Sequence, residues 1–124
     1  MPASKAIDHL SDLLGIPINE GKLPMELIWK GIFELEIVRW NSRLLLVGIV
    51  SKGVNPDDPL LSKVTRLRST TFARPQVVLA HQADSRRLIL WTALSDGNER
   101  DVVATRLTDL LAVMDSLLPA LPSL

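Results

Sequence analysis

Residues 26–53 read ELIWKGIFELEIVRWNSRLLLVGIVSKG, and they predict a β-hairpin that is apolar on both faces. In the first arm, Phe33, Leu35 and Ile37 alternate with other side chains and therefore share one face of a strand. Arg39–Arg43 interrupt the pattern and supply the turn. In the second arm, residues 44–50, every side chain is apolar, so this strand offers apolar surface to both sides of a sheet. One side forms the core, and the other must be covered by a helix, a second subunit or a ligand.

The composition predicts one soluble domain. A length of 124 residues fits a single domain, since domains usually span roughly 100–200 residues. A net charge of zero argues against a nucleic-acid partner and gives no electrostatic reason for membrane binding. The absence of cysteine excludes disulfides and thiolate metal sites. No signal-peptide core is present, and no apolar run reaches the roughly 18 residues of a spanning helix, so we expect a cytoplasmic protein.

The rest of the chain predicts helices and further strands around this hairpin. Apolar spacing and capping residues (Ser4, Asp57 or Asp58, and Asn98) predict helices over residues 4–14, from Pro59 for about three turns, and over residues 98–118. Alternating apolar runs predict strands over residues 25–29, 76–82 and 86–94. The order helix, three strands, helix, two strands, helix predicts an α+β domain of two layers, with helices on a twisted antiparallel sheet.

No group of residues predicts catalysis. His9 and His81 fall in different elements without nearby ligands, whereas zinc needs three or four. Motifs for a serine nucleophile, a phosphate loop or a dinucleotide are lacking. Glu34 and Glu36 share a strand face and are interpreted as solvated. We therefore predict no enzyme activity, no cofactor and no metal. The surplus apolar surface instead predicts a dimer with a groove or sheet edge for a partner.

Six segments carry a resemblance to a known family. They are LGIP at the end of the first helix, FELEI and LLLVGIV in the hairpin, PDDPLL at the start of the middle helix, and LILWTAL before a long helix that ends in MDSLL. Over nearly its whole length the chain resembles the class I type III secretion chaperones, the Tir-chaperone or CesT-like family of Gram-negative bacteria.

The resemblance implies a cytoplasmic homodimer that binds the N-terminal segment of a secreted effector and keeps it unfolded. Such a chaperone delivers its client to the type III export apparatus, whose ATPase is a further partner, and it hydrolyses no nucleotide itself. The implied effector-binding residues are Leu10, Leu14, Trp29, Phe33, Leu35 and Ile37. The implied dimer interface comprises Leu60, Leu61, Val64, Leu67 and Val78. A client strand can also add to a free sheet edge.

Two other interpretations stay open. One is a regulatory or structural subunit of a secretion system that pairs with an unlike partner through the same fold. The other is an unrelated α+β dimeric module. The residues also leave open which face of the hairpin is core. We expect the face of Phe33, Leu35 and Ile37 to be the client side, so that Leu35→Asp weakens client binding and leaves the dimer intact.

Overall fold

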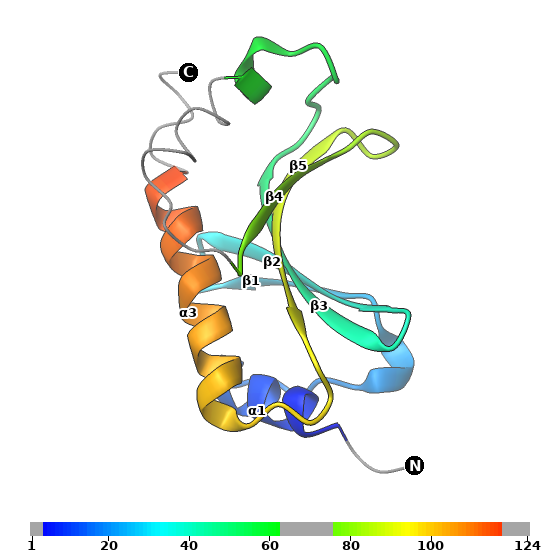
Figure 1. The fold of residues 1–124 in the computed structure, drawn as a ribbon, viewed down its shortest axis with the longest axis vertical. Coiled ribbons are helices and arrows are strands. Elements are labelled where there is room, and N and C mark those ends of the chain that lie inside the picture. The colour runs from blue at the N-terminus through cyan, green and yellow to red at the C-terminus, as the bar shows by residue number, and fades with distance from the viewer. Residues whose placement is uncertain (1–3, 63–75, 118–124) are drawn as a thin grey trace.

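The protein folds as helices packed on one face of a five-stranded antiparallel sheet, as the element order predicts (Figure 1). The computed structural model describes residues 4–62 and 76–117. Along the chain it has the following elements: α1 (Lys5–Leu14), the 3₁₀-helix η1 (Glu20–Lys22), β1 (Met25–Trp29), β2 (Phe33–Trp40), β3 (Arg43–Ser51), β4 (Val78–Gln82), β5 (Arg87–Leu94) and α3 (Arg100–Leu117). The predicted strands and terminal helices are confirmed, with ends that shift by one or two residues. The 3₁₀-helix was not predicted.

The strand order is β1-β2-β3-β5-β4, and every neighbouring pair is antiparallel. A three-residue turn, residues 30–32, joins β1 to β2, and a two-residue turn, Asn41 and Ser42, joins β2 to β3. At both turns the backbone adopts positive φ, at Lys30 and Gly31 in the first and at Asn41 in the second. Such turns match the right-handed twist of the strands that they connect. The hairpin of residues 33–51 therefore forms as its turn residues predict.

Capping residues fix the helix starts, with one difference from the prediction. Ser4 Oγ accepts a hydrogen bond from the Ile7 amide at 3.2 Å, and Asp58 Oδ1 accepts one from the Leu60 amide at 2.9 Å. Residues 59–62 are helical, and the remainder of the predicted middle helix lies outside the described residues. Asn98 does not cap α3, because its side chain closes the preceding turn by accepting a bond from the Ser95 amide at 2.7 Å.

The core lies between the sheet and the two long helices. Figure 1 shows α1 and α3 on the same side of the sheet. Beneath them lie the side chains of Phe33, Leu35 and Ile37, at most 7% exposed. The prediction that this face is open to a client is therefore wrong. Side chains in a strand alternate, so burying Leu35 directs Glu34 and Glu36 to the other side, where each carboxylate pairs with a cation.

None of the helices in the described ranges is long and apolar enough to cross a membrane.

One polar group in the core yields a stability prediction. Thr92 on β5 has no exposed surface, and its hydroxyl has no hydrogen-bond partner within the described part of the chain. Burying an unpaired hydroxyl costs free energy that an apolar group of similar shape avoids. We expect Thr92→Val to raise the free energy of unfolding by about 1 kcal/mol. Urea denaturation measures this change, and a lower midpoint would mean that the hydroxyl is paired.

Candidate functional site: the open face of the sheet

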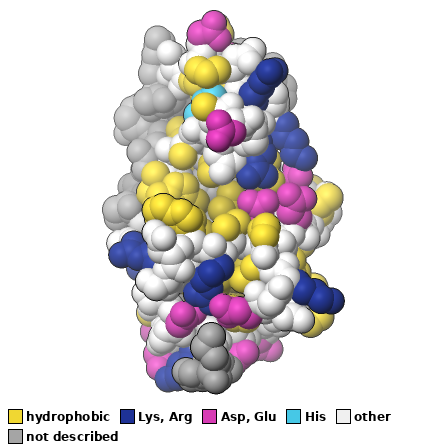
Figure 2. Space-filling model, turned by 90° about the vertical axis from the view of Figure 1, so that its right-hand side faces the viewer, with side chains coloured by type: hydrophobic (Ala, Val, Ile, Leu, Met, Phe, Trp, Pro, Cys, Tyr) yellow, Lys and Arg dark blue, Asp and Glu magenta, His cyan; other side chains and the backbone are white. Residues whose placement is uncertain are grey.

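The side of the sheet away from α1 and α3 carries an apolar cluster of its own. Val47, Ile49 and Ile89 are its centre and are 3–4% exposed, and Val38, Leu45, Ala80 and Trp91 pack around them, partly buried. Figure 2 shows this side of the molecule, with hydrophobic side chains gathered between charged ones. Neither α1 nor α3 covers the cluster. We call this surface the open face.

Strand pairing sets the arrangement of side chains on the open face. In one row across the sheet, Glu26, Glu36, Val47, Trp91 and Val78 are register partners from β1 to β4. The row is therefore acidic at one end and apolar at the other. In a second row Val38 lies opposite Leu45, and Leu45 lies opposite Ala93. Together these rows form an apolar strip that begins on β2 and continues over β3 and β5 to β4.

Tryptophans lie at two places on the open face. The chain has three tryptophans, and Trp40 and Trp91 both belong to the open face. Trp40, at the end of β2, is 60% exposed, whereas Trp91 is partly buried. Tryptophan is enriched among the residues that dominate binding energy at protein interfaces, because it buries a large area at little entropic cost. The open face thus has the composition of an interaction surface.

Ion pairs border the apolar strip. Lys52 Nζ lies 2.7 Å from Glu34 Oε1, and Arg87 Nη2 lies 3.3 Å from Glu36 Oε1. The second pair is the more buried, with side chains 18% and 12% exposed. It reaches from β5 to β2 across the intervening β3. The border is therefore polar but largely neutralised on this side.

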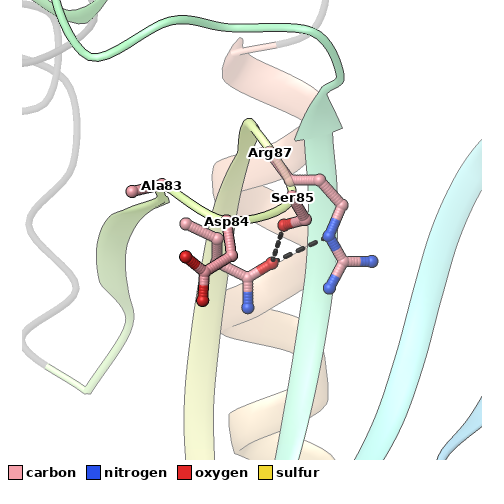
Figure 3. Close-up of a pocket in the computed structure, with 5 residues that line it drawn as sticks. Ala83, Asp84, Ser85 and Arg87 are labelled. Atoms are coloured by element: carbon pink, nitrogen blue, oxygen red, sulfur yellow. Dashed lines mark hydrogen bonds between the residues drawn. The ribbon is translucent and has the colours of Figure 1, made fainter.

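A small cavity at the β4–β5 turn shows how Arg87 is oriented. The cavity has a volume of about 360 Å³ and is lined by Gln82, Ala83, Asp84, Ser85 and Arg87. In Figure 3, Gln82 Oε1 accepts hydrogen bonds from both Ser85 Oγ, at 3.1 Å, and Arg87 Nε, at 2.8 Å. These contacts position the guanidinium for its pair with Glu36. The cavity itself holds no group that predicts chemistry.

A second polar network ties α1 to the far end of the sheet. Asp96 Oδ1 accepts hydrogen bonds from Ser4 Oγ at 2.7 Å and from Arg39 Nη1 at 3.0 Å. Arg39 also pairs with Glu20 of η1, and Arg100 of α3 pairs with Asp12 of α1. The Ser4 hydroxyl, followed by the Arg39 guanidinium, holds the pKa of Asp96 below its ordinary value of 3.8, although partial burial opposes the shift. Arg100 lowers the pKa of Asp12 in the same way.

This network predicts how stability depends on pH. Because the pKa of Asp96 is lower in the folded state, its contribution is complete above the unfolded pKa of about 4 and is lost as pH falls through the folded value. We expect Asp96→Asn to lower the urea midpoint at pH 7 and to flatten its decline below about pH 4. Ser4→Ala removes the main donor and should act in the same direction. If the urea midpoint of both variants declined below about pH 4 as it does in the wild type, the proposed contribution of Asp96 would be contradicted.

The predicted effector-binding residues come together, but as core. Leu10, Leu35 and Ile37 have no exposed surface, and Leu14 and Phe33 are 5% and 7% exposed. Trp29 is partly buried, with its ring centroid 6.5 Å from that of Phe33 and Lys30 Nζ 4.5 Å above it. A client therefore cannot reach Leu10, Leu35 or Ile37 without opening the fold.

The structure describes only some of the predicted dimer-interface residues. Leu60 and Leu61 pack against the core while staying partly exposed, and Val78 is partly exposed on the edge strand β4. Val64 and Leu67 lie outside the described residues. The homodimer thus stays a prediction.

The described residues, 4–62 and 76–117, contain no group of three or more His, Cys, Asp or Glu side chains that could hold a metal ion.

The fold is similar to that of chains in solved complexes of type III secretion chaperones with their effectors. A chain of the HopA1–SchA chaperone–effector complex superposes with a TM-score of 0.68 at 16% identity, over 94% of this chain and 91% of that one. A chain of the heterodimeric ExoU–SpcU complex from the Pseudomonas aeruginosa type III secretion system gives 0.68 at 21% identity, over 91% and 94%.

The same fold occurs outside secretion complexes. YbjN from E. coli, described as a putative transcription regulator, superposes with a TM-score of 0.56 at 19% identity, over 96% of this chain and 91% of that one. No family model and no curated protein matches the sequence. The resemblance found in the sequence is therefore confirmed at the level of the fold, and the narrower Tir-chaperone family stays a prediction.

Proposed function

We propose that this protein is a chaperone of type III secretion that binds the N-terminal segment of a secreted effector. The observation that carries the proposal is the open face, which α1 and α3 do not cover and on which Val38, Leu45, Trp91 and Trp40 keep exposed surface around a buried apolar centre. The proposal is further supported by the fold, whose solved examples include complexes of chaperones with effectors.

The structure favours a particular way of binding on this face. The backbone groups of β2, β3 and β5 are engaged on both sides by neighbouring strands, so they have no hydrogen bonds to offer a segment that lies over them. A bound segment must then satisfy its own backbone groups, which an amphipathic helix does. An extended client segment can instead pair with the free edge of β1 or β4. We propose a client that is helical on the open face and extended elsewhere.

The remaining parts of the proposal concern assembly and delivery. The protein acts in the cytoplasm as a homodimer, keeps the bound segment unfolded and presents it to the export apparatus and its ATPase. Leu60, Leu61 and Val78 retain exposed surface for the dimer interface. Catalysis has no part in this function.

Co-expression with secreted proteins encoded nearby tests the proposal. The protein should co-purify with the N-terminal segment of one of them, and Val38→Asp should weaken that complex at least tenfold by placing a charge in the apolar strip. Thr108→Asp is the matched control, since it adds the same charge on an exposed position of α3. Failure to bind any secreted protein would contradict the proposal. A complex with an unlike, non-secreted partner would instead favour a regulatory subunit.

A further inference from the structure

The open face changes in character from one edge of the sheet to the other. On β1 and β2 its side chains include Glu26, Glu34 and Glu36, whereas on β3, β5 and β4 they are mostly apolar, with Arg87 and Gln82 as polar exceptions near the β4–β5 turn. The row that contains Glu26 shows the change in full, because its next partners are Glu36, Val47 and then Trp91. A segment that lies along the apolar strip therefore has one end over carboxylates.

The carboxylates are not fully compensated within the described residues. Glu34 pairs with Lys52, and Glu36 pairs with Arg87, but Glu26 has no ion-pair partner in residues 4–62 and 76–117. Glu26 is exposed and lies directly opposite Glu36 in the β1–β2 ladder. Like charges directly opposite each other destabilise a sheet. Because Arg87 already pairs with Glu36, the uncompensated charge here is that of Glu26, at the place where the apolar strip meets the sheet edge.

We propose that the segment bound by the open face is basic at the end that lies over β1 and β2, and that Glu26 is a residue that selects it. This inference rests on the proposed function and adds the chemistry of the client. A lysine or arginine over Glu26 gives this carboxylate the cation that it lacks among the described residues, whereas an acidic residue there adds another negative charge beside it. The neighbouring Ile28, 67% exposed, gives the aliphatic part of such a side chain an apolar contact.

Two synthetic amphipathic peptides of about 18 residues serve as probes, one built from Leu and Lys and the other from Leu and Glu with the same apolar stripe. Fluorescence anisotropy of the labelled peptides should show at least tenfold tighter binding of the lysine peptide. Glu26→Gln should weaken that binding about threefold to fivefold, as expected for a charge at the border of an interface. Glu26→Lys should reduce it further and strengthen binding of the glutamate peptide.

Asp115→Asn is the matched control, because it removes one charge from an exposed position on α3. This variant should keep the preference for the lysine peptide over the glutamate peptide. Glu26→Gln should keep or raise the urea midpoint, which separates lost binding from lost folding. Equal binding of both peptides, binding of neither, or an equal effect of Asp115→Asn would overturn the inference.

The two proposals fail in different ways. If a secreted segment binds the wild type and Glu26→Lys with equal affinity, the chaperone function is supported and the proposed role of Glu26 is contradicted. If the lysine peptide binds as described while no secreted protein does, the preference of the open face for a basic segment is supported and the chaperone function is contradicted.

Discussion

Leu35→Asp is expected to abolish the folded state. Leu35 lies in the middle of β2 with no exposed surface, between Leu27 on β1 and Gly48 on β3. A carboxylate there has neither water nor a cation, so the protein must either bury an unpaired charge or protonate it at a high cost. The penalty exceeds about 4 kcal/mol, which is a large share of the stability of an ordinary domain. We expect an unfolded or aggregated protein rather than a folded chaperone with weak client binding.

Circular dichroism and urea denaturation measure this outcome. Val38→Asp is the matched control, since it places the same charge on the same strand but on the partly exposed open face. It should retain a cooperative unfolding transition while, under the proposed function, losing client affinity. A Leu35→Asp variant that unfolds cooperatively near the wild-type midpoint would show that the two faces of β2 have been exchanged.

The elements of this fold could be predicted because their signals are local. Ser4 and Gly15 mark the two ends of α1, and Pro59 follows the Asp58 cap of the middle helix, as the structure confirms. Turn residues and alternation likewise placed β1 with its observed bounds and the core of β3 to within one residue at each end. Each of these features depends on a few adjacent residues and on backbone geometry alone.

The choice of core face was predicted wrongly, because the second arm of the hairpin is apolar on both sides. In residues 44–50 the side chains that alternate to the two faces are apolar on both. Only packing against α1 and α3 decides which face becomes the core. The first arm did contain a usable signal. Glu34 and Glu36 belong to the set opposite Leu35, and burying carboxylates is far costlier than exposing part of an apolar cluster.

The open face could not be assembled from the sequence, since its rows depend on strand order. β3 pairs with β5 rather than with β4, so Val47 comes to lie beside Trp91, far along the chain. Glu26 and Glu36 become partners through the turn at Lys30 and Gly31, and their opposition appears only once the register is known. A site of this kind requires pairing information that local patterns lack.

Gly48→Ala is expected to destabilise the fold through one contact between β3 and α3. A Cβ at Gly48 would lie 2.4 Å from Met114 Sδ, and Met114 has no exposed surface into which it could move freely. The methionine must change rotamer or α3 must shift, and overpacking of this kind costs about 1–3 kcal/mol. Gly97→Ala is the control, because a Cβ there meets nothing within 4 Å. It should change stability by less than about 0.5 kcal/mol.

A double-mutant cycle isolates this contact from the general effect of a methyl group. Met114→Ala alone leaves a cavity and should cost about 2–5 kcal/mol. In the Gly48→Ala, Met114→Ala double variant the new methyl occupies part of that space, so the combined loss should be smaller than the sum by about 0.5–3 kcal/mol. Urea denaturation of the four proteins gives the coupling directly. Additive losses would show that the contact between Gly48 and Met114 does not limit the side chain at position 48. Glycine would then be required at this position for another reason.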